Sequence, residues 1–202
     1  MLYIDEDGFV DAERVIIKIF SMIERGVLRK VNGIIVHQTA SATASSTFNS
    51  YRNKGANGAH FLIDKDGKIY QTASLFKVTW HVGLSQSRCF VRKKCRPTEF
   101  QQVAEMEKSW RNYRKISALE QKKFFPDRFP NNSDSIGIEL VGQAKDSGKG
   151  ELVFESVNKK QNDSLKWLIR ELADTLNVSM TEVYRHPEIG RKNMTEASTA
   201  KW

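Results

Sequence analysis

The stretch from Asn32 to Ala40, NGIIVHQTA, predicts the centre of the fold. Its residues 33–36 are all apolar or glycine, which is typical of a short β-strand that is buried on both faces. His37 follows directly, and a run of small polar residues begins at Gln38. Because a sheet holds its residues rigidly, a histidine at the end of a buried strand is a candidate metal ligand. A hydrogen-bonded structural histidine is the alternative, and this stretch alone leaves both open.

The composition predicts one globular domain over residues 1–202 with an excess of positive charge. Hydrophobic residues make up 40% of the chain, which suits one domain with a sizeable core. No apolar run approaches the roughly 18 residues of a membrane span. The acidic start, MLYIDEDGFV, does not resemble a Sec signal peptide. The net charge of +8 favours polyanions such as nucleic acid, membrane surfaces or a cell-wall polymer.

Predicted strands alternate with predicted helices along the chain. Apolar spacing predicts helices over residues 11–25, 45–53 and 158–176. Residues 59–72 are typical of a hairpin with an Asp-Gly turn. Residues 134–142 predict a second buried strand, which contains Glu139, and residues 143–150 a loop. This alternation predicts an α/β fold with a central mixed β-sheet flanked by α-helices.

Residues 88–133 differ in character and predict a helical insertion, with helix over 98–123. The run is rich in Lys, Arg, Gln and Glu and has no strand pattern. It lies between the Trp80–His81 pair and the second buried strand, so we expect it to form a wall or lid of a substrate groove. A solvated helical hairpin is the alternative. Cys89 and Cys95 are either free thiols or a small disulfide loop, which would form only in an oxidising compartment.

Glu139 and His186 are candidates to join His37 at one edge of the sheet. Burial in an apolar strand would raise the pKa of Glu139, although strand alternation also permits this side chain to face solvent. If the two buried strands share a sheet, His37 and Glu139 can lie near the same strand ends. The polar tail of residues 183–202 could then bring His186 over that edge.

Five segments follow one another along the chain: VNGIIVHQTA, GAHFLIDKDGKIYQ, TWHVG, SIGIELVG and RHPEIGRKN. Together, in this order, they resemble the zinc-dependent N-acetylmuramoyl-L-alanine amidases. That group includes phage lysozyme-type amidases, bacterial muropeptide amidases and peptidoglycan recognition proteins. The resemblance covers roughly residues 30–84 and 134–202, and the insertion is longer than this loop usually is in the family.

The resemblance implies a catalytic zinc ion at one edge of the sheet, with His37 and His186 as ligands. Such an ion lowers the pKa of a water toward about 7 and polarises the scissile carbonyl. Glu139 matches the catalytic glutamate, which would move the proton from water to the leaving amine. Lys192 matches the lysine beside the metal, which would stabilise the oxyanion. The bond cut would be the amide between N-acetylmuramic acid and L-alanine, in peptidoglycan or muropeptides.

Three further histidine and tryptophan positions also match the family. Trp80 and His81 match a segment that faces the substrate groove, and His81 could also stabilise the oxyanion by hydrogen bonding. His60 matches a frequent family histidine that is not a ligand, and we expect a structural role for it.

The third zinc ligand is where the sequence departs from the family. The family supplies Asp or Cys two residues past the lysine, and the matching residue here is Met194, whose neutral thioether suits catalytic zinc poorly. Glu196 lies ten residues past His186, which leaves enough loop for it to fold back. Since Glu is an accepted zinc ligand, we expect Glu196 to complete the site. The alternative is that Glu196 is a surface residue.

Three classes of function stay open on the sequence. A zinc amidase is favoured over a metal-free peptidoglycan-binding module, because a binding module has no need of a general base. A nucleic-acid binder is disfavoured, since no recognised motif is present and the basic residues look spread out rather than gathered. We expect a chain made in the cytoplasm that acts in a periplasm or on the cell wall after secretion or lysis. If it is a toxin, the producing cell should hold a neutralising immunity protein.

Overall fold

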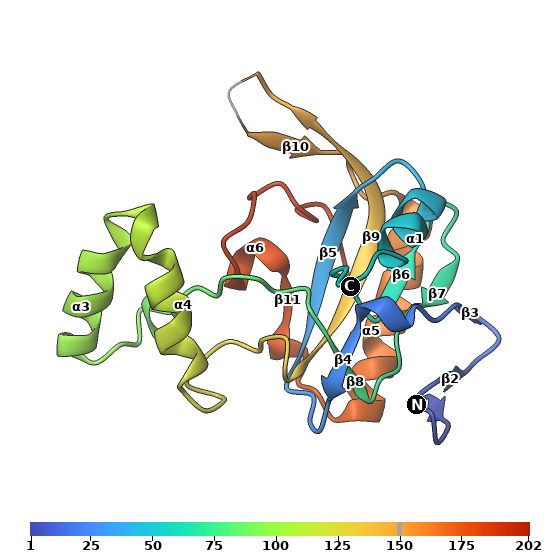
Figure 1. The fold of residues 1–202 in the computed structure, drawn as a ribbon, viewed down its shortest axis with the longest axis horizontal. Helices are drawn as coiled ribbons and strands as arrows, with labels where there is room; N and C mark the ends of the chain where they lie inside the picture. Colours follow the sequence, from blue (N-terminus) through green and yellow to red (C-terminus); the bar gives the residue numbers. More distant parts are fainter. Residues whose placement is uncertain (149–150) are drawn as a thin grey trace.

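A seven-stranded mixed β-sheet forms the centre of the computed structural model, which describes residues 1–148 and 151–202 (Figure 1). Strands β11, β5, β9 and β6 run parallel, whereas β7 is antiparallel to β6 and β10 is antiparallel to β9. The predicted α/β fold with a mixed sheet is confirmed. In spatial order the strands are β11 (Val183–Arg185), β5 (Gly33–Ala40), β9 (Ser135–Asp146), β6 (Phe61–Ile63), β7 (Ile69–Gln71) and β3 (Val15–Ile17), with β10 (Leu152–Phe154) paired to the end of β9.

The two faces of the sheet are covered by different helices. Helix α5 (Lys159–Leu176) packs its apolar stripe against one face, on which Ile34, Val36 and Ile138 lie. Helix α1 (Ala44–Tyr51) packs Phe48 against the other face, beside Leu62 of β6. Because side chains alternate along a strand, the residues between those of the α5 face point toward the α1 side. His37 and Glu139 belong to this second set.

Local sequence signals explain where the main elements begin and end. Helix α5 starts at a capping box, in which the side chains of Asn158 and Gln161 accept each other's backbone N–H groups, and it ends at Asn177 in the left-handed conformation. The turn between β6 and β7 ends at Gly67, whose φ of +88° favours glycine. These predicted elements therefore agree with the structure within a few residues.

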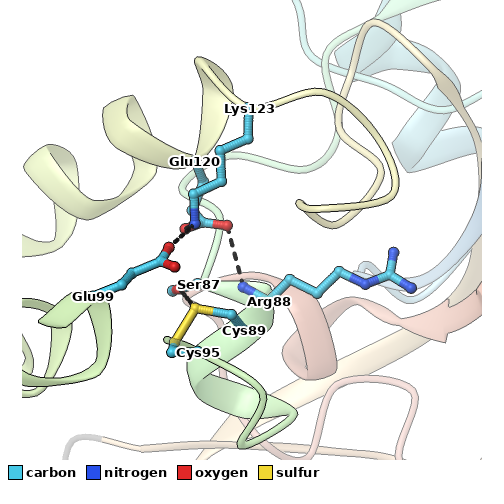
Figure 2. Close-up of a disulfide and its surroundings, with 7 residues drawn as sticks. All are labelled: Ser87, Arg88, Cys89, Cys95, Glu99, Glu120 and Lys123. Carbon is cyan, nitrogen blue, oxygen red and sulfur yellow. Dashed lines mark hydrogen bonds and ion pairs between the residues drawn. A yellow bond between two sulfur atoms is a disulfide. The ribbon is translucent and has the colours of Figure 1, made fainter. Parts of the chain in front are cut away.

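The insertion stands apart from the sheet at one end of the molecule (Figure 1). It is helical, as predicted, but the expected helix over 98–123 is divided in two by a short 3-10 turn. A small apolar cluster of Val103, Met106 and Ile116 holds the two helices together. Cys89 and Cys95 form a disulfide, which decides between the two alternatives (Figure 2). The elements are α2 (Arg88–Val91), α3 (Pro97–Glu107), η2 (Trp110–Asn112) and α4 (Tyr113–Gln121).

Two sequence predictions about secondary structure are wrong. Residues 11–25 do not form a helix, because Val15–Ile17 pair with β7 as an edge strand and the following residues form a 3-10 turn and strand β4. Residues 143–146 continue β9 instead of starting a loop, because they pair with β10; residues 149–150 lie outside the described part. The remaining short elements are β1 (Tyr3–Ile4), β2 (Val10–Asp11), η1 (Ser21–Ile23), β4 (Glu24–Val27), β8 (Lys77–Thr79), η3 (Met180–Glu182) and α6 (His186–Ile189).

Candidate active site

Strand register places His37 directly beside Glu139. The two residues are paired across the parallel strands β5 and β9, so their side chains point to the same face of the sheet. Strand β5 continues to Ala40, so His37 lies within the strand rather than at its end, as the sequence had suggested. Both side chains line one cavity of about 690 Å³.

His186 and Glu196 converge on His37 from the C-terminal part of the chain. His186 begins helix α6, immediately after β11, which is the neighbour of β5 in the sheet. Its Nδ1 lies 2.8 Å from Nδ1 of His37 and 3.0 Å from Oε1 of Glu196. The same Oε1 lies 3.5 Å from Nδ1 of His37. The three potential ligand atoms thus lie within 4.8 Å of one another, as a metal site requires.

Hydrogen bonding and burial set the protonation states of this group. His186 donates from Nε2 to the carbonyl oxygen of Val82 at 2.7 Å, which leaves the lone pair of Nδ1 facing the other two residues. Burial, reinforced by His186, lowers the pKa of His37 to about 4. Burial raises the pKa of Glu196, but the contacts of its carboxylate with His186 and His37 outweigh burial and lower that pKa to about 2. A neutral imidazole and an ionised carboxylate are the forms that bind a metal.

Glu139 carries a buried carboxylate oxygen that faces this group. Its Oε2 has no hydrogen-bond partner among the described residues. Burial, followed by the charge of Glu196, raises the pKa of Glu139 to about 8, while Lys192 acts in the opposite direction. The question left open by the sequence is thereby answered, because Glu139 faces the cavity. A buried acceptor without a partner, beside a set of metal-ligand atoms, is suited to receive a proton from a bound molecule.

Residues 28–198 match the profile of a known family, described as N-acetylmuramoyl-L-alanine amidase. The chain belongs to this family. It is therefore an amidase that acts on peptidoglycan, as the five sequence segments had indicated. No curated protein matches the sequence significantly.

Solved structures of similar fold include other amidases. A selenomethionine derivative of AmpD shares 17% identity with a TM-score of 0.53, covering 95% of this chain and 89% of that one. AmpDh3 from Pseudomonas aeruginosa, in complex with an anhydromuramic pentapeptide, shares 21% identity with a TM-score of 0.52. That match covers 95% of this chain but 60% of AmpDh3. At these identities the likeness concerns the fold.

The cavity of the amidase is lined mainly by strands of the sheet and by three loops, at residues 57–58, 80–83 and 191–196. Trp80, half of whose surface is exposed, stands at the rim with the guanidinium of Arg25 4.8 Å from its ring centre. Leu152 and Phe154 of β10 also line the cavity. From residues 88–133, within the described part, the lining includes Asn132 alone. The expectation that the insertion forms a wall or lid is therefore wrong, and the β9–β10 hairpin takes that place.

His81 lies in the cavity wall with both ring nitrogens engaged by the protein. Its Nδ1 is 2.9 Å from Nε2 of His37, and its Nε2 is 3.2 Å from Oγ of Ser135. Gly137 makes this placement possible, because a Cβ there would lie 2.9 Å from the His81 ring. His81 thus contacts the ligand group rather than projecting freely into the cavity. His60, by contrast, is fully buried and bonded to the backbone of Lys77 and Gly137, as expected of a structural residue.

Arg191 and Asn132 are site residues of the amidase that the sequence did not reveal. Arg191 lines the cavity beside Lys192 and forms an ion pair with Glu107 of the insertion. Oδ1 of Asn132 accepts hydrogen bonds from the backbone N–H groups of His81 and Val82 at 2.9 and 2.8 Å. Arg191 stands in the RHPEIGRKN segment, which assigns it no role, whereas Asn132 stands in no recognisable motif. Their contacts join segments far apart in the chain, so local sequence does not reveal them.

Proposed function

We propose that the amidase binds zinc between His37, His186 and Glu196 and cleaves the amide between N-acetylmuramic acid and L-alanine. The observation that carries this proposal is the convergence of two Nδ1 atoms and one carboxylate oxygen beside the unpartnered Oε2 of Glu139. Two imidazoles and a carboxylate are an accepted ligand set for catalytic zinc. The exposure of Met194, at 75%, against 6% for Glu196 supports the choice of Glu196 as third ligand.

The chain's own residues then account for the movement of protons. When bound, zinc polarises the scissile carbonyl and lowers the pKa of water. Glu139 accepts a proton from the attacking water at Oε2 and returns it to the leaving amine. In the metal-free protein burial raises the pKa of Glu139, which makes its carboxylate a stronger base than an exposed glutamate. The ammonium of Lys192, which lines the cavity, stabilises the developing oxyanion.

The rest of the cavity wall would position the substrate. Trp80 offers an exposed aromatic surface at the rim, and the apolar side chains of β10 offer a second surface for the stem peptide. His81 holds His37 through its ring nitrogen, in addition to lining the groove. A metal-free binding module has no use for an unpartnered buried carboxylate, so the position of Glu139 favours catalysis.

The disulfide bears on the compartment in which the enzyme acts. A bond between Cys89 and Cys95 supports action in an oxidising compartment such as a periplasm, or on an exposed cell wall. None of the described helices is long and apolar enough to cross a membrane. We also propose that residues 1–202 act as one domain. The neutralising partner protein expected of a toxin stays a prediction.

The proposal is tested by digesting purified sacculi and following the released products by chromatography and mass spectrometry. The expected products are stem peptides with a free L-alanine amine and glycan strands with intact sugars. Glu139→Gln should keep zinc and fold but lose roughly 100- to 10,000-fold in rate, because an amide cannot accept the proton. Glu151→Gln, a change of the same type at an exposed residue near the cavity rim, is the matched control. A Glu139→Gln enzyme that retains more than about a tenth of the rate would exclude this residue as the base.

A further inference from the structure

Nearly all of the net positive charge of the amidase is concentrated in the insertion. Residues 88–133 contain twelve Lys or Arg and five Asp or Glu, a net charge of +7 out of +8 for the whole chain. The remaining 156 residues together carry +1. The expectation that the basic residues are spread out rather than gathered is therefore wrong. The electrostatic field of charges gathered in one segment is directional, so an approaching polyanion is attracted toward the insertion.

The acidic residues of the insertion are mostly occupied by partners within the protein. Lys123 pairs with both Glu99 and Glu120, at 2.6 Å each, in a cluster beside the disulfide (Figure 2). Glu107 is paired with Arg191, which lies outside the insertion. Eight exposed basic side chains are left without an ion-pair partner in the described part of the chain. They are Arg92, Lys93, Lys94, Arg96, Arg111, Arg114, Lys115 and Lys122.

These eight side chains form two groups with a fixed backbone. The first, the basic loop (residues 92–96), lies within and directly after the ring closed by the Cys89–Cys95 disulfide. The second is the basic stripe (Arg111, Arg114, Lys115 and Lys122) along α4 and its ends. Arg114 and Lys115 lie three and four residues past Arg111, and Lys122 lies seven past Lys115, about two turns, so the stripe occupies one outward side of that helix. The disulfide and the helix therefore constrain the backbone that carries both groups before any ligand arrives, which lowers the entropic cost of binding.

We propose that the basic loop and basic stripe dock the enzyme on the carboxylates of intact peptidoglycan, outside the cleft. This inference rests on the proposed function, which makes that polymer the substrate. Stem peptides carry free carboxylates at regular intervals, so they match a rigid array of cations. The insertion stands apart from the sheet (Figure 1), and of its described residues Asn132 alone lines the cavity, so it can contact glycan strands that are not being cut. A second contact raises the effective substrate concentration at the cleft without altering the chemistry.

The test compares two variants with equal charge. In the insertion variant, Lys93, Lys94, Arg96, Arg114 and Lys115 are changed to Gln. In the control variant, five exposed basic residues outside the insertion are changed to Gln: Lys30, Lys54, Lys160, Lys166 and Arg170. Both sets are also made in the Glu139→Gln background, so that binding to sacculi can be measured by co-sedimentation without digestion.

We expect the insertion variant to lose at least about tenfold in affinity for sacculi at about 0.01 M salt, and the control variant to lose much less. At about 1 M salt, where charges are screened beyond about 3 Å, the two should be alike. Turnover of a soluble muropeptide, which needs only the cleft, should be equal in both. Equal affinity losses in the two variants would overturn the proposal, since net charge alone would then explain binding.

Two further measurements distinguish peptidoglycan from other polyanions at this surface, and distinguish failure of the docking proposal from failure of the proposed function. Sedimentation with anionic phospholipid vesicles, and with duplex DNA, should show weaker dependence on the insertion than sacculi do. A stronger dependence for either one would overturn the assignment to peptidoglycan. If wild-type enzyme bound sacculi through the insertion but released no stem peptides, the proposed function would fail while the docking surface stood.

Discussion

The guanidinium of Arg191 lies 4.0 Å from the ring centre of Tyr113 and forms an ion pair with Glu107. Both partners belong to the insertion, whereas Arg191 precedes Lys192 in the loop that also carries Glu196. The insertion therefore contacts the loop of Lys192 and Glu196, although Asn132 alone of its described residues lines the cavity. Cation–π and ionic contacts to the same guanidinium fix its position more firmly than either would alone.

We predict that replacing Glu107 by Gln together with Tyr113 by Leu lowers kcat by roughly 10- to 100-fold, with little change in KM. The reason is that Lys192 loses its alignment with the oxyanion, and small misplacements are costly in catalysis. Steady-state kinetics on a soluble muropeptide measures this. Glu105→Gln, an exposed residue of the same helix, is the control and should be silent. An unchanged kcat in the double variant would show that the loop of Lys192 keeps its position without these two contacts to the insertion.

The third metal ligand can be identified by metal analysis. Glu196→Ala should lose zinc after dialysis, because the remaining two histidines rarely complete a zinc site. Met194→Ala should retain it, since this side chain is exposed and lies outside the ligand group. Zinc content measured by mass spectrometry gives the answer directly. Loss of zinc from Met194→Ala but not from Glu196→Ala would reverse the assignment.

His81→Ala should weaken zinc binding by roughly 10- to 100-fold, because the hydrogen bond that orients a ligating histidine is lost. The bond in question joins Nδ1 of His81 to Nε2 of His37. Competition with a chelator measures the affinity, and Ser135→Ala, which removes the next hydrogen bond, should have a smaller effect. If His81→Ala instead raised KM at constant zinc affinity, its ring would contact the substrate and not act through His37.

Acid should destabilise the metal-free protein through its buried histidines. Burial lowers the pKa of His60 from 6.5 to about 4. Between these values the unfolded chain binds a proton that the folded chain does not, so the free energy of unfolding falls as pH drops from about 6.5 to about 4. The shift is worth on the order of 3 kcal/mol.

Urea unfolding at pH 7 and at pH 4.5 checks this expectation in wild-type protein and in His60→Gln. The variant loses the two backbone contacts of the ring, so it should be less stable at pH 7. Its further loss on acidification should nevertheless be smaller, because one titrating group is gone. His37 and His81, whose pKa values are also lowered by burial, remain in both proteins. Identical losses on acidification would mean that His60 does not contribute.

The sequence predicts the sheet well where a strand is buried and apolar. Residues 33–36 are apolar or glycine, and so are residues 136–142 apart from Glu139; these segments form parts of the adjacent central strands β5 and β9. It fails at residues 11–25, where apolar positions fit a helix equally well. Residues 15–17 form a strand there because they pair with the edge of β7. Local spacing cannot reveal a pairing partner that is distant in sequence.

In the candidate site, too, local sequence predicts some residues, whereas others depend on contacts with distant parts of the chain. His37, Glu139 and His186 stand in recognisable segments, and the structure brings them together. The sequence indicates Glu196 only because the thioether of Met194 suits zinc poorly, and in the structure Glu196 is buried against both histidines. The roles of Asn132 and Arg191 depend on contacts across 50 and 84 residues, and such contacts leave no local trace.

The hydrogen bonds of Asn132 have a consequence for how this enzyme can diversify. They tie the end of the insertion to the backbone at His81 and Val82, shortly before the insertion begins, so its two ends lie close together. The length and sequence of a segment joined in this way can change without moving the sheet, provided that the contacts of Glu107 and Tyr113 with Arg191 are kept. Exchange of residues between Val82 and Asn132 would then allow one hydrolytic core to be redirected to cell envelopes of different composition.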